Sequence, residues 1–299
     1  MRDFISILDF SRSELESIFE EADRMREINC SDILEGRIMA LAFFEPSTRA
    51  RLGFSAAMFK LGGGVIELGG PEKSAMSRGE NFSDTIKVLD GIADVIVIRH
   101  GLEGASKLAA QIADSPVINA GDGSREYPVQ GILDLYAIKS FLGRIDGLHI
   151  GIIGDLRYGR SVRSFILGLT RFLPAKLYLM SPESLKIKED IREALNISRI
   201  DFEEISWLEE VISELDVLYV TRLQKERFPD ISEYEKLKGT YRIEKSLLKE
   251  AKERMIILHP LPRTDELSPE VDETPHAKYF KQAALYVPVA MAILRAAML

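Results

Sequence analysis

The sequence is poor in the residues that build disulfides and metal centres. Its 299 residues include a single cysteine, Cys30, and four histidines. One cysteine cannot form an internal disulfide and leaves no ligand cluster for zinc or an iron–sulfur centre. We therefore expect neither a metal nor a cofactor.

The chain also lacks long apolar runs and an excess of positive charge. No run approaches the length needed to cross a bilayer, and the start, MRDFISILDF, lacks the pattern of a signal peptide. Lys and Arg number 39 against 47 Asp and Glu, a net charge of −8. This balance argues against broad nucleic-acid binding and against a polybasic membrane patch. We expect a soluble, cytoplasmic protein in which local groups of arginines bind any anion.

Short apolar runs rich in β-branched residues alternate with helical patterns along the chain. The runs are residues 37–44, 64–68, 94–100, 116–121, 148–155, 176–182, 217–222 and 255–262. Buried parallel strands have this composition. The two successive α/β blocks predict two doubly wound parallel-sheet domains joined by helices. We place the first domain at residues 1–130 plus 285–299 and the second at 131–284.

Two local patterns predict helices. Ser13 and Glu16 suit a capping box at the start of an amphipathic helix. The acidic run 201–215, DFEEISWLEEVISEL, is typical of the solvated face of a helix.

Arginine recurs just after the apolar runs. Ligands of open α/β sheets bind at the carboxyl ends of strands, so these positions lie where a ligand is expected. Like charges gathered at one edge repel one another unless an anion joins them. The pattern therefore predicts an anionic ligand. The arginines concerned are Arg49, Arg99 (followed by His100), Arg160, Arg222 and Arg263.

The segment EPSTR, residues 45–49, lies between a predicted strand and a predicted helix. Pro46 ends the strand, and Ser47 suits the N-cap position of the helix. Amide groups at a helix N-terminus attract phosphate, and Arg49 can bind it through two nitrogens. The chain has no Gly-x-x-x-x-Gly-Lys pattern, so a nucleotide P-loop is not expected.

The stretch FFEPSTRARLGF, residues 43–54, resembles the Ser-Thr-Arg-Thr-Arg signature of the aspartate and ornithine carbamoyltransferases. Further segments follow in this family's order and spacing, and the last three resemble its aspartate-specific branch. They are KSAMSRGENFSDTI, IVIRH, NAGDGS, YPVQGILDL, GDLRYGRSV, LYVTRLQKERF and HPLPRTDEL.

The resemblance implies a transferase that joins carbamoyl phosphate to L-aspartate in pyrimidine biosynthesis, giving N-carbamoyl-L-aspartate and phosphate. The first domain would bind carbamoyl phosphate and the second would bind aspartate. The family also implies a homotrimer with shared active sites, which in some members associates with regulatory chains.

Site residues follow from the same resemblance. Those expected to hold the phosphate are Ser47, Thr48, Arg49 and Arg99, with Ser74 and Arg78 contributed by a neighbouring subunit. Those expected at the carbamoyl nitrogen are Gln130 and the backbone carbonyls of Pro260 and Leu261. Those expected to bind the aspartate carboxylates are Arg160, Arg222 and Gln224. Arg49, Arg99 and Gln130 would be catalytic.

The chemistry of this reaction suits the residues. Two anionic substrates need several permanent cations, and arginine offers a planar fork to phosphate and carboxylate alike. Attack of an amine on the carbamoyl carbon builds negative charge on the carbamoyl oxygen, which preorganised donors stabilise. The reaction requires no metal and no covalent nucleophile.

Four positions depart from the family pattern. Ala50 replaces a threonine and Tyr127 replaces a histidine, and both of the usual side chains help to hold the carbamoyl oxygen. The Tyr127 phenol can partly substitute for the missing donors. Arg78 replaces a lysine and Ala290 an arginine. Two interpretations stay open: a working enzyme with compensating contacts, and a catalytically weak or inactive paralogue that acts as a binding or scaffold protein.

A dinucleotide-binding oxidoreductase is a third, disfavoured hypothesis, prompted by the stretch HIGIIGDLRYG. Its glycines, Gly151, Gly154 and Gly159, miss the Gly-x-Gly-x-x-Gly spacing. The next predicted strand also ends without the acidic residue that a ribose needs. We expect His259, in LHPLP, to be structural and to anchor a loop through its imidazole.

Overall fold

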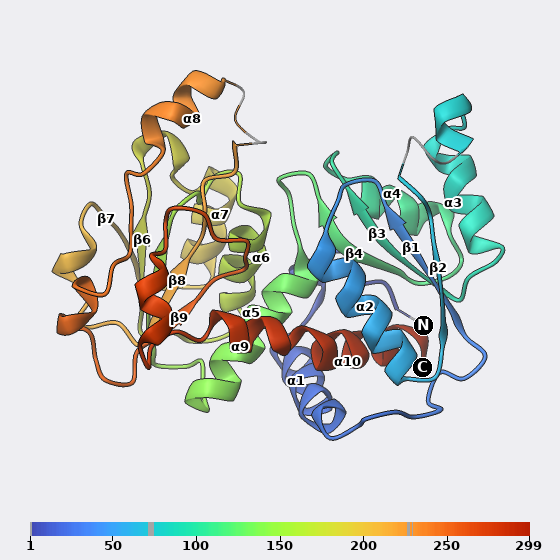
Figure 1. The fold of residues 1–299 in the computed structure, drawn as a ribbon, viewed down its shortest axis with the longest axis horizontal. Coiled ribbons are helices and arrows are strands. Elements are labelled where there is room, and N and C mark those ends of the chain that lie inside the picture. Colours follow the sequence, from blue (N-terminus) through green and yellow to red (C-terminus); the bar gives the residue numbers. More distant parts are fainter. Residues whose placement is uncertain (1, 71–74, 226–227, 229) are drawn as a thin grey trace. The chain divides into compact units, whose positions relative to one another are not determined.

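The computed structural model describes residues 2–70, 75–225, 228 and 230–299. The chain forms two compact units, Met1–Ile132 with Leu285–Leu299, and Leu133–Ala284 (Figure 1). Each unit contains one fully parallel sheet with helices. The predicted fold class is therefore confirmed.

The sheet of the first unit has the strand order β2-β1-β3-β4. Its strands are β1 (Ile38–Phe43), β2 (Gly64–Glu67), β3 (Val95–His100) and β4 (Val117–Asp122). Each strand falls on one of the predicted apolar runs to within one or two residues. All three strand pairs are parallel, and most residues of β1, β3 and β4 are buried, as expected for a sheet that helices cover on both faces.

Helices cover the first sheet in two groups. Helix α10 packs against α1 and α2, with α2 against β1 and β2, while α3 packs against α4 and β3 and α4 packs against β3 and β4. Alternate strand residues such as Ala40 and Ile98 form a core with Ile86 of α3 and Ala109 of α4. The helices are α1 (Arg12–Arg26), α2 (Thr48–Lys60), α3 (Phe82–Asp90), α4 (Ala105–Ile112) and α10 (Tyr286–Met298), with short helices η1 (Ile7–Asp9) and η3 (Ala75–Arg78).

The sheet of the second unit has the strand order β7-β6-β5-β8-β9, and all four strand pairs are parallel. Its strands are β5 (His149–Ile153), β6 (Lys176–Met180), β7 (Phe202–Ile205), β8 (Val217–Val220) and β9 (Ile256–Leu258). Leu218, Val220 and Ile257 belong to the apolar core on one face. On α6 (Arg160–Leu169), Phe165 stacks on the Tyr219 ring with the centroids 4.5 Å apart.

Helix α5 (Pro128–Leu142) carries the chain from the first unit into the second. The other helices of the second unit are α6 (Arg160–Leu169), α7 (Glu189–Ile197), α8 (Ile231–Leu237) and α9 (Tyr279–Ala284). Its short helices are η4 (Glu183–Leu185), η5 (Leu208–Glu210), η7 (Leu247–Glu250) and η8 (Pro269–Glu273).

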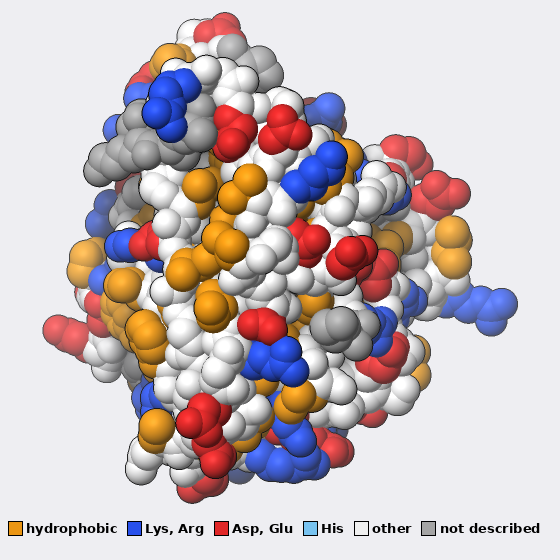
Figure 2. All heavy atoms as spheres, turned by 90° about the vertical axis from the view of Figure 1, so that its right-hand side faces the viewer, with side chains coloured by type: hydrophobic (Ala, Val, Ile, Leu, Met, Phe, Trp, Pro, Cys, Tyr) orange, Lys and Arg blue, Asp and Glu red, His pale blue; other side chains and the backbone are white. Residues whose placement is uncertain are grey.

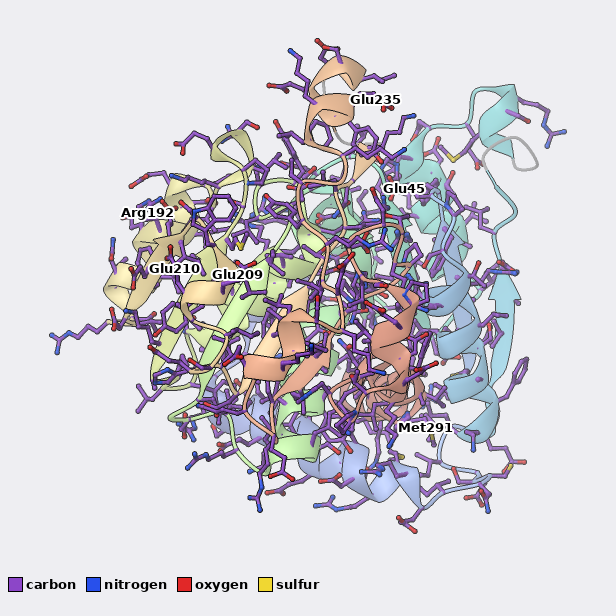
Figure 3. The ribbon with its side chains drawn as sticks, turned by 60° about the vertical axis from the view of Figure 1, so that its left-hand side comes forward. Glu45, Arg192, Glu209, Glu210, Glu235 and Met291 are labelled. Carbon is purple, nitrogen blue, oxygen red and sulfur yellow. The ribbon has the colours of Figure 1, made fainter. Side chains whose placement is uncertain are left out.

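Both local helix predictions need correction. The capping box of α1 is formed by Ser11 and Glu14, two residues before the predicted pair, and the Ser11 amide donates to Glu14 at 2.7 Å. The acidic run 201–215 is not a helix face. It contains the edge strand β7 and the short helix η5, where Glu209 and Glu210 lie (Figure 3).

The strand orders create one topological switch point in each unit. β1 lies beside β3 in the first sheet, and β5 lies beside β8 in the second. At such a point the two connections lead to opposite sides of the sheet, and ligands bind in the crevice that results. The loops after these four strands are therefore the parts of the fold to inspect for a site.

We predict that Gly154 is indispensable at the second switch point. It has a φ of +125°, and a Cβ added there would lie 2.1 Å from the Thr221 carbonyl oxygen after β8. Gly154→Ala should lower the free energy of unfolding by about 3 kcal/mol, through strain and a backbone clash. Gly147 is the control, with a φ of +70° and nothing within 4 Å; Gly147→Ala should cost only about 1 kcal/mol. Equal losses in chemical denaturation would contradict the close approach of β5 and β8.

Candidate functional site

The loop after β1 ends in a capped helix, as predicted. Ser47 is the N-cap of α2, and its hydroxyl oxygen accepts a hydrogen bond from the Ala50 amide at 3.4 Å. Thr48 and Arg49 are exposed on the first turn, which carries no acidic residue. The positive end of the helix dipole therefore has no negative side chain on its own first turn, which favours an anion there.

The two arginines of the STRAR segment have different surroundings. Arg51 forms an exposed ion pair with Glu67 at the end of β2, with Nη1 3.2 Å from both carboxylate oxygens. Arg51 is therefore matched by a carboxylate within the fold, whereas Arg49 lies on the first turn of α2, where the helix dipole favours an anion.

Arg99, near the end of β3, is mostly buried and incompletely hydrogen-bonded. Its Nη1 donates to the Ala120 carbonyl oxygen at 2.9 Å, and its Nε lies 3.9 Å from Glu45 Oε2. The Nε is buried and has no hydrogen-bond partner in the described part of the chain. Glu45 lies beside the first turn of α2 (Figure 3). A buried cation with an unused donor suits an anionic ligand.

His100 adds no positive charge to this loop at neutral pH. Burial lowers the pKa of its imidazole, and the nearby Glu45 carboxylate opposes this shift only in part. Its Nδ1 accepts a hydrogen bond from the Leu102 amide at 2.9 Å, and its ring packs on Phe44 with the centroids 4.9 Å apart. His100 therefore shapes the loop.

Tyr127 immediately precedes helix α5 and Gln130 lies on its first turn, and both residues are buried. The Gln130 amide donates to the Tyr127 carbonyl oxygen at 3.0 Å. The Arg99 guanidinium lies 5.8 Å from the centroid of the Tyr127 ring, so the structure brings these two predicted residues together. The Tyr127 hydroxyl pairs with that of Tyr286 at 2.8 Å. Tyr286 was missed in the sequence, because the pair is separated by 159 positions.

In the second unit the predicted residues flank the β5/β8 switch point. Arg160 is the first residue of α6, and only 6% of it is exposed. Arg222 and Gln224 follow β8 and are partly buried.

Asp155 links the two loops at this switch point. Its Oδ1 accepts hydrogen bonds from the amides of Arg157 at 3.1 Å and Tyr158 at 2.8 Å, and the Gln224 amide also donates to the carboxylate. Burial raises the pKa of Asp155 to about 6, although these hydrogen bonds and the Arg222 charge oppose the rise. Sequence reasoning missed Asp155, yet it stands at a strand end where the same rule could have found it.

His259 is structural, as predicted. It is fully buried; its Nδ1 accepts from the Leu261 amide at 2.8 Å, and its Nε2 lies 2.8 Å from Glu266 Oε1. These contacts hold the loop that contains Pro260 and Leu261. Leu261 has a φ of +53°, a strained value for a residue with a side chain, which the contacts around His259 maintain.

A buried hydrogen-bond network supports the same loop from behind. The His259 amide donates to Gln282 Oε1 at 2.9 Å, and the Gln282 amide group donates to Asp134 Oδ1 at 2.6 Å. The other oxygen of Asp134 accepts from the Tyr219 hydroxyl at 2.8 Å. Because the network joins α5, α9 and β8, the orientation of the Pro260 and Leu261 carbonyls is fixed by the core.

The remaining predicted positions are less informative. Arg78 is exposed at the end of η3, and Ser74 lies outside the described residues. Ala50 and Ala290 are both buried. The expectation for Arg263 needs correction, because its guanidinium is paired with Asp272, with Nη2 2.6 Å from Oδ2. Arg263 is thus matched within the fold.

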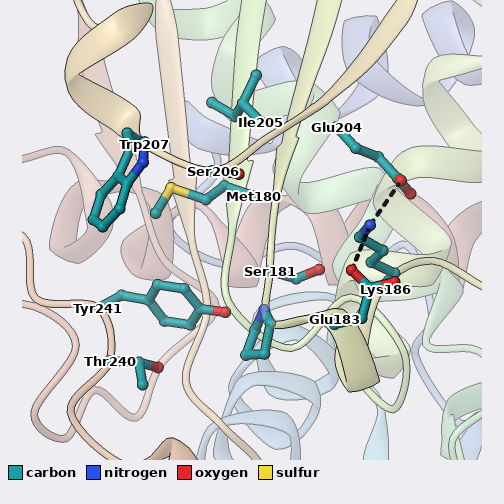
Figure 4. Close-up of a pocket in the computed structure, with 11 residues that line it drawn as sticks. Met180, Ser181, Glu183, Lys186, Glu204, Ile205, Ser206, Trp207, Thr240 and Tyr241 are labelled. Carbon is teal, nitrogen blue, oxygen red and sulfur yellow. Dashed lines mark ion pairs between the residues drawn. The ribbon is translucent and has the colours of Figure 1, made fainter.

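The second unit also has a pocket that contains none of the predicted residues (Figure 4). It has a volume of about 440 Å³ and is lined on one side by Met180, Trp207 and Tyr241. On the other side Lys186 lies between Glu183 and Glu204, at 2.8 and 3.4 Å. These two carboxylates neutralise the positive charge of Lys186, so this pocket is a poor anion site.

The described residues include neither a metal-binding cluster nor a membrane span. No group of three or more His, Cys, Asp and Glu side chains there could hold a metal ion. None of the described helices has the length and apolar character that spanning a membrane requires.

Comparison with known proteins identifies the family. The family model for the aspartate/ornithine carbamoyltransferase carbamoyl-P binding domain matches residues 2–140, and the model for the Asp/Orn binding domain matches residues 146–297. The chain belongs to the aspartate/ornithine carbamoyltransferase family. The resemblance seen in the sequence is therefore confirmed.

Individual relatives of this family match over nearly the whole chain. The aspartate carbamoyltransferase catalytic subunit of Thermofilum pendens is 58% identical over 296 residues, covering 98% of this chain and 94% of that protein. The catalytic subunit of M. jannaschii aspartate transcarbamoylase has a TM-score of 0.90 at 47% identity, covering 99% and 97% of the two chains. Trypanosoma cruzi aspartate transcarbamoylase in complex with carbamoyl phosphate and aspartate has a TM-score of 0.94 at 38% identity, covering 98% and 96%.

We predict that Glu266 stabilises the protein in a pH-dependent way. Burial acts to raise its pKa, but hydrogen bonds with His259 and Thr264 prevail and lower it to about 2. A depressed carboxyl pKa stabilises the fold above the ordinary pKa of 4.5 and loses this effect as the pH falls toward 2. Glu266→Gln should lower the free energy of unfolding by roughly 3 kcal/mol at pH 7 and by much less near pH 2.

Denaturant titrations from pH 2 to pH 7 would measure this difference. The control is Glu210→Gln, which changes an exposed carboxylate on η5 and should shift stability by less than about 0.5 kcal/mol. A Glu266→Gln deficit of constant size at all pH values would show that the pair is not the source of the effect.

Proposed function

We propose that this chain is the catalytic chain of an aspartate carbamoyltransferase. It transfers the carbamoyl group of carbamoyl phosphate to L-aspartate, giving N-carbamoyl-L-aspartate and phosphate. The observation that carries the proposal is the position of the arginines. Arg49 and Arg99 flank the switch point of the unit matched by the carbamoyl-P binding model, and Arg160 and Arg222 flank that of the unit matched by the Asp/Orn binding model.

The first unit, with boundaries near 1–130 and 285–299, is proposed to bind carbamoyl phosphate. The phosphate accepts hydrogen bonds from Ser47, Thr48 and the first turn of α2, and Arg49 and Arg99 balance its charge. This charge increases on the phosphate as the bond to the carbamoyl carbon breaks, so the same arginines stabilise the leaving group. Tyr127 donates to the carbamoyl oxygen.

The second unit, near residues 131–284, is proposed to bind aspartate. Arg160, Arg222 and Gln224 hold its two carboxylates, and Asp155 keeps the loops that carry them in place. The uncharged amine of aspartate then attacks the carbamoyl carbon, the bond from this carbon to the phosphate oxygen breaks, and the proton lost by the amine passes to the departing phosphate. Gln130 and the carbonyls of Pro260 and Leu261 are proposed to hold the carbamoyl nitrogen.

The departures from the family pattern do not remove the main cations. Both Arg49 and Arg99 are present. Ala50 and Ala290 are buried, and an alanine side chain has no polar group that burial would leave without a hydrogen bond. The relatives compared above are named as catalytic subunits or aspartate transcarbamoylases. These names give no support to a non-catalytic paralogue.

The assembly and location are also proposed. A homotrimer with shared active sites, in which Ser74 and Arg78 serve a neighbouring subunit, needs an apolar contact surface. Leu52 and Phe59 of α2 are more than half exposed, as are Val88 of α3 and Ile92 in the turn after α3, and hydrophobic side chains lie among mixed charges on the face in Figure 2. Exposed apolar groups of this kind favour protein contacts. Regulatory chains and a cytoplasmic location stay predictions.

A variant of Arg49 tests the proposed function. Arg49→Gln should lower kcat/KM for carbamoyl phosphate by about 10²–10³-fold, because it removes a cation from the leaving group. The matched control, Arg51→Gln, changes the neighbouring arginine that pairs with Glu67 and should leave kcat/KM within about threefold of wild type. The measurement is the rate of carbamoyl aspartate formation.

Two outcomes would count against the proposal. Wild-type turnover equal to a protein-free blank would exclude the activity. Equal losses in the two variants would show that the segment matters only for folding.

A further inference from the structure

Two tyrosine hydroxyls meet in the interior of the first unit. Tyr127 precedes α5 and Tyr286 is the first residue of α10, and their oxygens lie 2.8 Å apart. Only 7% and 6% of these residues are exposed. A buried phenol needs a hydrogen-bond partner, and each of these finds one in the other.

The Tyr286 ring is fixed against helix α2. A Cβ added at Gly53 would lie 2.3 Å from Tyr286 Cδ1, so a glycine is required for the ring to fit. Phe54 packs edge-on against the same ring, with the centroids 5.8 Å apart. The helix that carries Arg49 on its first turn therefore also fixes the position of the Tyr286 hydroxyl.

The hydroxyl pair lies in the field of the two proposed phosphate-binding arginines. The Arg99 guanidinium lies 5.8 Å from the centroid of the Tyr127 ring, and the charges of Arg99 and Arg49 both act on Tyr286. Burial, followed by the contact with Tyr127, raises the pKa of the Tyr286 hydroxyl well above its usual value despite these charges. Tyr286 therefore keeps its proton in the working pH range.

The direction of the hydrogen bond follows from the acceptors. The two hydroxyls hold two protons, and one of these lies in the bond between them. The carbamoyl oxygen gains negative charge during the reaction and is then a stronger hydrogen-bond acceptor than a phenol oxygen. The hydroxyl next to it therefore donates its hydrogen bond to the carbamoyl oxygen. If that hydroxyl is Tyr127, Tyr286 must donate to Tyr127. Hydrogen bonds in such a chain polarise one another, so the second donor strengthens the first.

We propose that Tyr286 is a positioning residue of the transferase reaction, which orients and polarises the Tyr127 hydroxyl toward the carbamoyl oxygen. This inference rests on the proposed function. It accounts for a site that has Ala50 and Tyr127 in place of two usual donors to this oxygen: the chain supplies a buried relay of two hydroxyls. Inorganic phosphate has no carbamoyl oxygen, so the relay should not contribute to its binding.

Tyr286→Phe tests the proposal, because it removes the hydroxyl and keeps the ring on Gly53 and Phe54. A lost hydrogen bond of ordinary strength, with weakened polarisation of Tyr127, should lower kcat/KM for carbamoyl phosphate about 5- to 10-fold. The dissociation constant of inorganic phosphate, from calorimetry, should stay within about twofold of wild type. Weaker phosphate binding by the same factor would overturn the proposal, since it would indicate a general distortion of the unit.

A double-mutant cycle shows whether Tyr286 acts through Tyr127. Tyr127→Phe should have the larger effect, and the double variant Tyr127→Phe/Tyr286→Phe should match Tyr127→Phe alone. Independent effects that multiply would overturn the proposal. Tyr178→Phe is the control for loss of a hydrogen-bonded tyrosine hydroxyl elsewhere in the protein, because Tyr178 donates to Glu214 at 2.5 Å in the second unit. It should change the melting temperature and leave kcat/KM unchanged.

The outcomes separate this inference from the function on which it rests. Wild-type turnover with an unaffected Tyr286→Phe variant overturns the relay and leaves the function intact. Absence of wild-type turnover overturns the function. In that case the dissociation constants of carbamoyl phosphate for wild type and Tyr286→Phe still test the relay. Equal constants, or no binding by either protein, would reject it.

Discussion

The constraint on which the rest of the structure depends is the parallel order of the two sheets. Every parallel strand delivers its carboxyl end to one edge, and each strand order has one point where neighbouring connections diverge. Arg49 and Arg99 stand at this point in one unit, and Arg160 and Arg222 in the other. A capped helix, a strand end and a buried carboxylate hold these cations there, and we propose that they provide the charge that anionic substrates require.

Most of the architecture could be predicted from the sequence because the information is local. Buried parallel strands are continuous apolar runs, and Ser47 caps a helix by bonding to an amide three residues away. Strand β7 is the one described strand of the second sheet that the sequence did not predict. It lies at the edge of the sheet, where Glu203 and Glu204 are tolerated, so its sequence is not a continuous apolar run. The capping box was misplaced because two Ser-x-x-Glu patterns overlap and only the buried face of α1 selects Ser11.

The site was less predictable where it depends on contacts between distant segments. The strand-end rule selects Arg99, Arg160 and Arg263 alike, and only the structure shows that Arg263 pairs with Asp272 on η8. The Tyr127–Tyr286 pair joins the two separate segments of sequence that make up the first unit. Neither residue shows from its neighbours that its hydroxyl has a partner. In the sequence, Tyr127 in place of the family's histidine looks like the loss of a hydrogen-bond donor. The structure shows that the Tyr127 hydroxyl has a partner in the Tyr286 hydroxyl.

The most direct test of the central claim is a crystal structure of the protein with a bisubstrate analogue that joins a phosphonate to aspartate. The account predicts that the phosphonate contacts Ser47, Arg49 and Arg99, while the aspartate carboxylates contact Arg160 and Arg222. An analogue bound elsewhere, such as the pocket lined by Trp207 and Tyr241, with these arginines left without contact to it, would contradict the account.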